Sequence, residues 1–240
     1  MGSSSLPLTD QVFEQLEAAI IKGDLPQGSK ISEPELAKAY GISRGTLREA
    51  LSRLEERHLL MRSPNLGARV TTLSFEELAN IYQIREVLGG LSCSLAAQNM
   101  TDTEIRKLRA LLDEQEKSLE AGQGLSCNQH ELEFGFHYQI LQGNRNPKVL
   151  TVLEGGLYQQ IRMYRCQFSS LGQRPYQAFK EHRRIVDAIE ERDAELADIL
   201  MRRHIRTALQ SIEGQHQDAM EQNKQGESQP PLIKEETEKV

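Results

Sequence analysis

Two short helical segments separated by a tight turn constrain the N-terminal part of the chain most strongly. Ser32-Glu-Pro-Glu35 has the pattern of a capping box with proline in the first turn, which predicts a helix from there to Tyr40. Gly41-Ile42-Ser43 then predicts a turn, and Ser43 is placed to cap the next helix. The apolar residues of that second helix share one side, which predicts a buried face made of Leu47, Ala50, Leu51 and Leu54.

The flanking segments complete a small domain. Helical spacing of apolar residues predicts a helix from about Thr9 that stops at Gly23. After the helix pair, residues 59–62 and 68–71 read as two short strands around a loop that contains Pro64 and Gly67. We therefore expect a winged helix-turn-helix over residues 1–73. The first five residues, Met-Gly-Ser-Ser-Ser, are left out of this fold prediction.

This domain has the charge pattern of a surface that binds double-stranded DNA. Residues 41–70 carry six Arg and three Glu, a local net charge of +3, whereas the whole chain carries −6. The recognition helix of such a fold lies in the major groove, where guanidinium groups bind phosphate or guanine. An ordinary solvated face is the alternative, but the capped helices, the wing and the local charge agree on DNA. The predicted DNA-contacting residues are Arg44, Thr46 and Arg48 on the helix and Gly67 and Arg69 in the wing.

From Ser74 onward the pattern is helical only. Capping boxes begin at Ser74 and Thr101, and glycine or proline separates the later segments. The predicted helices span residues 75–98, 102–121, 127–142, 147–168, 174–192 and 194–215. The fold class is therefore mainly α, with a winged helix-turn-helix followed by an antiparallel bundle of about six helices over residues 74–215. Residues 216–240 are acidic and polar, which predicts a disordered tail.

The composition argues for a cytoplasmic protein. No apolar run approaches 18 residues, and the N-terminus lacks the features of a signal peptide, so no membrane partner is expected. The three cysteines, at positions 93, 127 and 166, have no paired spacing, so we expect no disulfide framework.

Four residues of the predicted bundle have the chemistry of metal ligands. Glu133 and His137 are four residues apart and point off one helix face, while His182 and His204 lie on the apolar sides of two later helices. Burying these polar groups without partners is costly, and a divalent ion such as Zn, Ni, Fe or Mn satisfies all four. Each histidine alone is better explained as a hydrogen-bonded core residue, but four converging groups favour a metal. The remaining histidines, at positions 58, 130 and 216, have no predicted role.

The N-terminal segments resemble the GntR family of bacterial transcription regulators. The resemblance is carried by Leu25-Pro-Gln-Gly-Ser-Lys-Ile31, Glu35-Leu-Ala37 and Tyr40-Gly-Ile-Ser-Arg-Gly-Thr-Leu-Arg-Glu-Ala-Leu-Ser-Arg-Leu54. It implies that the family's DNA-contacting Arg, Thr and Arg correspond to Arg44, Thr46 and Arg48, and its wing glycine to Gly67. Many relatives have Arg where this chain has Pro34, so the operator sequence does not follow from the resemblance.

Residues 75–212 resemble the all-helical effector domain of the FadR subfamily, in the branch of vanillate-type regulators. Glu133-Phe-Gly-Phe-His137, the segment that begins Glu181-His182, and His204-Ile205 match its metal-ligand pattern, although many relatives have Asp at the first position. The resemblance implies a small carboxylate effector. Arg85, beside an apolar stripe, is the predicted effector-binding residue, and an ion pair with Glu86 or Glu133 is its alternative role. Arg162 and Arg165 are weaker candidates on the same reasoning.

These features lead to one main hypothesis, a ligand-responsive repressor that is not an enzyme. Two heads of a homodimer contact the half-sites of a pseudo-palindromic operator, and the effector shifts their arrangement. A metal-dependent hydrolase is an alternative, but four protein ligands leave little room for water and substrate. In a third reading the metal is structural or is itself the signal.

Overall fold

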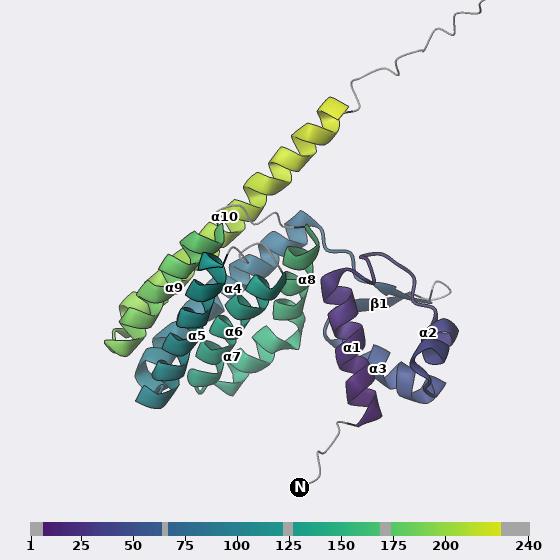
Figure 1. Ribbon diagram of the computed structural model, residues 1–240, viewed down its shortest axis with the longest axis horizontal. Helices are drawn as coiled ribbons and strands as arrows, with labels where there is room; N and C mark the ends of the chain where they lie inside the picture. The colour runs from purple at the N-terminus through teal and green to yellow at the C-terminus, as the bar shows by residue number, and fades with distance from the viewer. Residues whose placement is uncertain (1–6, 64–66, 122–126, 169–173, 227–240) are drawn as a thin grey trace, which may run out of the picture.

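The computed structural model describes residues 7–63, 67–121, 127–168 and 174–226. Residues 7–73 form a winged-helix unit, and residues 74–226 form a helical bundle beside it (Figure 1). The predicted class, mainly α with a winged helix-turn-helix and an all-helical bundle, is confirmed. Among the described residues no helix has an apolar stretch long enough to cross a membrane.

The winged-helix unit consists of three helices and a two-stranded wing. Helix α1 spans Leu8–Lys22, α2 spans Glu33–Tyr40, and α3 spans Arg44–Glu56. Strands β1 (Leu60–Ser63) and β2 (Gly67–Val70) pair antiparallel, with Leu60 opposite Val70 and Ser63 opposite Gly67. The loop between the strands lies outside the described residues.

The turn between α2 and α3 follows the sequence prediction, but the cap of α2 does not. Gly41 takes the left-handed conformation (φ 64°), which ends α2, and the Ser43 side chain accepts a hydrogen bond from the Thr46 N–H. Ser32 precedes α2 without a side-chain cap, so the capping box predicted for Ser32-Glu-Pro-Glu35 is wrong. Pro34 has no N–H to donate in this first turn, which removes one of the two usual donors of a cap.

The helical bundle begins with two helices that carry the predicted capping boxes. Helix α4 (Phe75–Asn99) begins after Ser74, and α5 (Asp102–Glu120) begins after Thr101. In each case the N-cap side chain accepts from the N–H of a glutamate that in turn binds the N-cap N–H. The later helices are α6 (Cys127–Gly143), α7 (Pro147–Val152), α8 (Tyr158–Phe168), α9 (Arg174–Glu190) and α10 (Ala194–Gly226).

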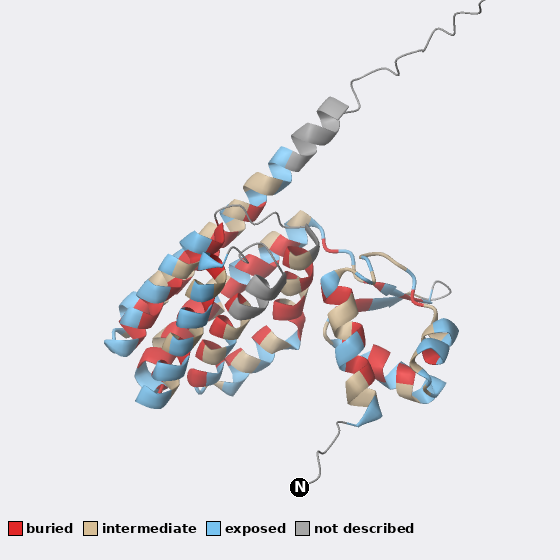
Figure 2. Cartoon of the chain, in the orientation of Figure 1, coloured by how far each residue is buried: buried red, intermediate tan, exposed pale blue. Residues whose placement is uncertain are grey.

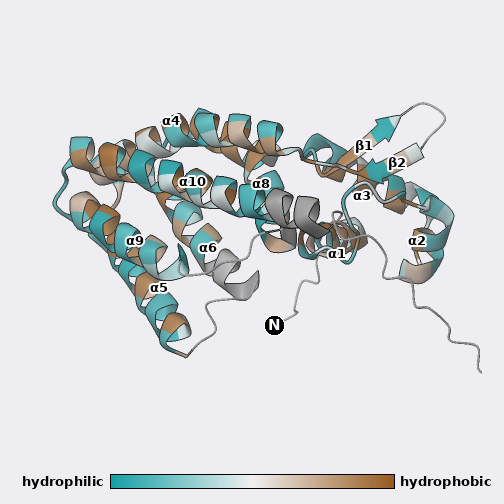
Figure 3. Cartoon of the chain, turned by 90° about the horizontal axis from the view of Figure 1, so that it is seen from above, coloured by the Kyte–Doolittle hydropathy of each residue, from teal (hydrophilic) through white to brown (hydrophobic). Residues whose placement is uncertain are grey.

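Buried residues line the inner faces of these helices, and α4 and α10 pack side by side along the bundle (Figures 2 and 3). Neither Cys93, which is buried, nor Cys166, which is half-buried, forms a disulfide in the described part of the chain, while the Cys127 side chain lies outside the described residues.

Two predicted helices differ from the observed ones. The helix predicted over residues 147–168 is interrupted by segment η1 (Leu153–Leu157), where Gly156 has φ 128° and ψ −30°. Only glycine adopts such angles readily, so the Gly155-Gly156 pair breaks the helix. The last helix continues to Gly226 and projects beyond the bundle (Figure 1), so residues 216–226 of the predicted disordered tail are helical. Their Gln, Glu, Ala, Met and Lys residues have high helix propensity, and the His216 ring stacks on Phe75 at the start of α4. Residues 227–240 lie outside the described residues.

The two units meet where α1 packs against α8 and where the end of α3 approaches η1. A methyl group built on Gly156 would lie 2.7 Å from the Arg57 carbonyl oxygen and 2.8 Å from the His58 ring. There is therefore no room for a side chain between Gly156 of the bundle and the Arg57-His58 segment of the winged-helix unit.

Candidate metal centre and nucleic-acid interface

The four predicted metal ligands lie together in the core of the bundle. Glu133 and His137 come from α6, His182 from α9 and His204 from α10, and each has at most 5% of its surface exposed. One potential ligand atom from each residue lies within 4.8 Å of the others. Packing of three helices thus brings together residues as far as 71 positions apart in sequence (204 − 133).

Two distances between the imidazole nitrogens match those of a tetrahedral metal site. His204 Nε2 lies 3.3 Å from His182 Nε2 and 3.3 Å from His137 Nε2. With metal–nitrogen bonds of about 2.0 Å, tetrahedral geometry places two nitrogen ligands about 3.3 Å apart. The donor set of three imidazoles and one carboxylate suits Zn, Ni, Fe or Mn, so these residues fit a divalent ion.

Hydrogen bonds behind two of the histidines support the same arrangement. His204 Nδ1 lies 2.7 Å from Glu181 Oε2, and His182 Nδ1 lies 3.3 Å from Gln115 Oε1. If each Nδ1–H donates to its oxygen, both Nε2 atoms carry lone pairs that face each other. Such facing lone pairs repel unless a cation lies between them.

The environment keeps the histidines neutral. Burial lowers the pKa of His137 well below its usual value, and the charge of Arg85 lowers it further. Burial also lowers the pKa of His182 well below its usual value. The pKa of His204 is lowered by burial, and the hydrogen bond to Glu181 opposes part of that effect. Neutral imidazole is the form that binds metals, so the site is ready for a cation near pH 7.

Glu133 is held by an arginine that the sequence analysis ranked only as a weak effector candidate. Arg165, on α8, donates from Nη1 and Nη2 to the two Glu133 oxygens, each at 2.6 Å. Burial raises the pKa of Glu133, but the charge and hydrogen bonds of Arg165 outweigh it and hold the pKa well below its usual value. The longer side chain of Glu133 thus reaches both the histidines and Arg165.

Arg85 has no acidic partner in the described part of the chain. The two predicted alternatives are taken elsewhere, because Glu133 pairs with Arg165 and Glu86 pairs with Arg206. Arg85 is 2% exposed, and its Nε and Nη1 have no hydrogen-bond partner. Its guanidinium lies 5.4 Å from the centre of the Tyr82 ring and 5.7 Å from that of the Tyr158 ring. Burying a cation without an anionic partner is costly.

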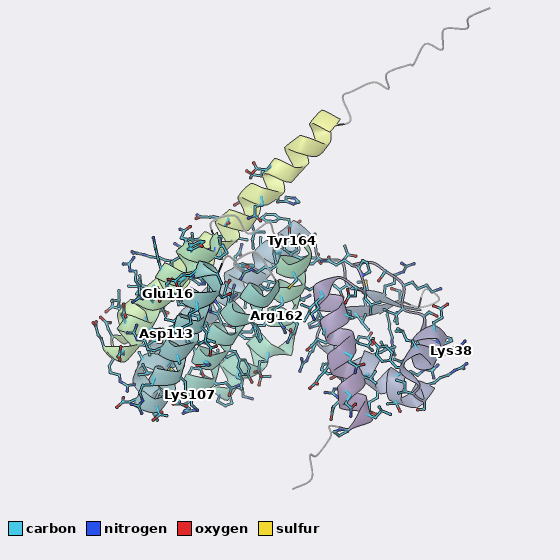
Figure 4. All side chains as sticks on the ribbon, viewed as in Figure 1. Lys38, Lys107, Asp113, Glu116, Arg162 and Tyr164 are labelled. Carbon is cyan, nitrogen blue, oxygen red and sulfur yellow. The ribbon has the colours of Figure 1, made fainter. Side chains whose placement is uncertain are left out.

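A small cavity joins Arg85 to the metal ligands. It holds about 20 Å³, enough for one water molecule. Figure 4 shows one of its lining residues, Arg162, on α8. The cavity is lined by Arg85, Glu133, Phe134, His137, Tyr158, Ile161, Arg162 and Arg165.

The predicted DNA-contacting residues lie on α3 and in the wing, and all but Thr46 are exposed. Arg44 and Arg48 are exposed on α3, and Thr46 between them is half-buried. Arg48 Nε donates to Glu33 on α2 at 2.8 Å, a contact that the sequence analysis did not predict. In the wing, Gly67 is exposed with φ 77°, and Arg69 donates to the Gly28 carbonyl at 2.9 Å.

Sequence reasoning assigned no role to three residues that touch the metal ligands or their backbone, which are Glu181, Gln115 and Arg174. It assigned Arg165 a different role, as a weaker effector candidate, whereas the structure pairs it with Glu133. Glu181 stands directly before His182, so helical periodicity places it on a different face and gives no signal that it approaches His204.

The chain joins a winged helix of the DNA-binding type to an all-helical unit with a buried polar cavity. This combination is typical of a ligand-binding regulator. Residues 8–70 match the gntR family of bacterial regulatory proteins, and residues 80–207 match the FCD domain. The chain belongs to the GntR family of bacterial transcription regulators, among the members whose C-terminal part is an FCD domain. The family predicted from the sequence is confirmed.

Individual relatives agree with this assignment. The chain is 29% identical over 191 residues to the HTH-type regulator YdhC of Bacillus subtilis, covering 78% of this chain and 83% of the relative. It is 26% identical to the Glc operon transcriptional activator of Escherichia coli, covering 90% and 95%. These relatives are transcription regulators and not enzymes, as the sequence analysis expected, so the hydrolase alternative finds no support.

Solved structures show the same fold. Escherichia coli McbR/YncC superposes with a TM-score of 0.73 at 21% identity, covering 88% of this chain and all of that one. A GntR regulator from Rhodococcus sp. RHA1 superposes with a TM-score of 0.68 at 23% identity, covering 86% and 97%.

Proposed function

We propose that this regulator is a repressor that releases DNA when a small carboxylate binds beside a metal ion in the helical bundle. The observation that carries the proposal is the placement of Arg85, a buried cation without an acidic partner, on the same cavity as Glu133 and His137. We assign the chain to the FadR subfamily, near the vanillate-type regulators, and place its action in the cytoplasm, where its operator lies.

The divalent cation would be held by Glu133, His137, His182 and His204. When bound, the ion would attract one carboxylate oxygen of the effector as an additional, fifth ligand, since such sites can expand from four to five ligands. Arg85 then provides the second contact, because its Nε and Nη1 have no hydrogen-bond partner and each can donate to an anionic group. The two contacts together select a short ligand with an acidic group, and the aromatic walls at Phe134 and Tyr158 favour a compact carbon skeleton.

Effector binding requires movement of the cavity wall. A cavity of about 20 Å³ holds one water molecule and no carboxylate, so the lining side chains must shift. Tyr158 is part of that wall and directly follows η1, the segment in which Gly156 lies too close to the Arg57 carbonyl to carry a side chain. Tyr158 also lines a second, larger cleft together with Arg57. A shift of Tyr158 therefore reaches the end of α3, whose other end carries the DNA-contacting residues.

In this proposal the major groove is contacted by three residues of α3: Arg44, Thr46 and Arg48. The wing contacts the neighbouring groove through Gly67 and Arg69. Arg48 leaves Glu33 to do so. Side chains of this kind contact phosphates as well as bases, so binding weakens as salt rises.

A homodimer places two such heads on the half-sites of a pseudo-palindrome. An apolar row on α4 supports this assembly, because Ile84, Val87 and Leu91 are 47%, 53% and 38% exposed at helical spacing. A second copy of the chain that packs on this row would bury it.

Fluorescence anisotropy on labelled DNA from upstream of the chain's own gene tests the proposal. We expect tight binding by the wild type and at least a tenfold loss in the Arg44→Ala/Arg48→Ala variant. Arg106→Ala, which removes an exposed arginine on α5, is the matched control and should bind like the wild type. Equal binding by all three proteins would contradict the DNA interface.

A thermal-shift screen of small carboxylates, with metal content measured on the same sample, tests the sensing part. A hit should raise the melting temperature, weaken DNA binding, and lose both effects in Arg85→Met. If chelation lowers stability but no carboxylate changes DNA binding, the metal is structural or is itself the signal, and the sensing proposal is wrong.

A further inference from the structure

The strongest contact behind the metal ligands is the one between Glu181 and His204. Glu181 lies on α9, and its Oε2 is 2.7 Å from Nδ1 of His204 on α10. The His204 side chain has no exposed surface, whereas the Glu181 side chain is 23% exposed. The carboxylate therefore connects a buried imidazole to the rim of the bundle.

Arg174 fixes this carboxylate in place. Its Nη1 donates to Glu181 Oε1 at 3.0 Å, and its Nη2 donates to the His204 carbonyl at 3.2 Å. The guanidinium thus spans the acid and the backbone of the same histidine. Because Arg174 and Glu181 both lie on α9, seven residues apart, they form one side of a brace against α10.

A carboxylate held by a guanidinium accepts hydrogen bonds and has no proton to donate. At 2.7 Å from it, His204 Nδ1 must therefore carry the proton, which leaves a lone pair on Nε2. That Nε2 is the atom that lies 3.3 Å from the Nε2 atoms of both His137 and His182. The contact with Glu181 orients the ring so that its metal-binding nitrogen faces the centre of the cluster.

We propose that Glu181 is a positioning residue of the metal centre, which fixes the Nδ1–H tautomer of His204 and makes Nε2 a stronger metal ligand. The inference rests on the proposed metal-binding function. Carboxylates behind metal-bound histidines act in this way in general, and their loss lowers metal affinity 10- to 100-fold. Gln115, whose Oε1 lies 3.3 Å from His182 Nδ1, has the equivalent but uncharged position behind a second ligand.

A purely mechanical brace between α9 and α10 would also use these contacts, so the test must separate the two roles. Loss of a brace lowers the stability of the metal-free protein and leaves the tautomer of His204 unchanged. Loss of a positioning residue changes the tautomer and the metal affinity. Glu190→Gln is the matched control, because Glu190 lies on the same helix, pairs with Arg109 and is away from the cluster.

The first measurement is a long-range ¹H–¹⁵N spectrum of histidine-labelled, metal-free protein, with His204 assigned by a His204→Gln variant. We expect the Nδ1–H tautomer in the wild type and in Glu190→Gln. Glu181→Ala should show a mixture of tautomers, and Glu181→Asp should partly restore the wild-type pattern. A His204 ring with the wild-type tautomer in folded Glu181→Ala would overturn the proposal.

The second measurement is the affinity for Zn²⁺ and Co²⁺ by competition with a chelator. We expect Glu181→Ala to bind 10- to 100-fold more weakly and Glu190→Gln to bind like the wild type. Glu181→Gln, which keeps the shape of the side chain, guards against a loss of folding and should show a smaller decrease. Affinities in folded Glu181→Ala within twofold of the wild type would overturn the proposal. A wild-type protein that takes up neither ion contradicts the proposed metal site, whereas the tautomer spectra still decide the role of Glu181.

Discussion

Replacing Arg165 with methionine should destabilise the metal-free protein strongly and make its stability depend on metal. The side chains of Arg165 and Glu133 are only 11% and 7% exposed, and two hydrogen bonds of 2.6 Å join them. The Arg165→Met variant keeps an apolar stem of similar length but leaves the Glu133 carboxylate buried without its cation. Removing one partner of a buried ion pair costs about 3–5 kcal/mol. That is a large fraction of the roughly 5–15 kcal/mol that stabilises a typical domain.

A divalent cation should restore much of this loss, because it neutralises the same carboxylate. A ligand present at 100 times its dissociation constant stabilises the folded state by about 2.7 kcal/mol. We expect the added stability to be larger in Arg165→Met than in the wild type, where Glu133 is already paired. The double variant Glu133→Gln/Arg165→Met removes the buried charge and should be more stable than Arg165→Met without metal.

Urea unfolding followed by circular dichroism, in chelator and in excess Zn²⁺, measures these differences. Arg109→Met is the control, since Arg109 pairs with the exposed acids Asp187 and Glu190 and such surface pairs contribute at most about 1 kcal/mol. A cost below about 1 kcal/mol for Arg165→Met in chelator would refute the argument that Glu133 depends on this cation. An equal response of both proteins to Zn²⁺ would refute its role as a ligand.

Three further predictions follow from the site, the contact between the units and the α4 surface. Burial lowers the pKa values of His137 and His182, so protons bind the unfolded chain more readily and acid destabilises the folded state. Between pH 7.5 and 5.5 the chelated protein should lose about 1.4 kcal/mol per histidine, by urea unfolding, and a variant with both changed to Gln should lose less. Gly156→Ala should weaken the effect of the effector on DNA affinity and leave metal affinity unchanged. Gly155→Ala should behave like the wild type, because Gly155 has φ −66° and open space around it. Val87→Arg should convert a dimer to a monomer in light scattering, and an unchanged mass would place the interface elsewhere.

Local patterns made most of the fold predictable. The capping boxes at Ser74 and Thr101 marked two helix starts to within a residue, because the bonds that form them lie within one turn of the chain. The convergence of Glu133 and His137 with His182 and His204 could be inferred because each lies on an apolar helix face, and such faces turn inward in a bundle. That they bind a metal stays a prediction.

What could not be predicted depends on how helices cross and which rotamers their side chains adopt. Nothing in the spacing of Glu133 and Arg165 shows that α6 and α8 bring them into an ion pair. The same holds for Glu33 and Arg48 on neighbouring helices of the winged-helix unit. The break at Gly155-Gly156 had a visible signal, two adjacent glycines, but apolar periodicity on either side favoured a continuous helix over residues 147–168.

The position of that break gives the glycine pair a function beyond ending a helix. A continuous helix over residues 147–168 would present side chains, with their Cβ atoms, to the winged-helix unit. With Gly156 at φ 128° the position that a Cβ would take faces the Arg57 carbonyl, which leaves no room for a side chain. Because Gly156 has no side chain whose rotamers absorb a displacement, the proposed mechanism expects a shift of Tyr158 at the cavity wall to reach Arg57 at the end of α3. An effector that enlarges the present cavity would then be coupled to the DNA-contacting helix through this short stretch of chain, and Gly156→Ala tests that coupling.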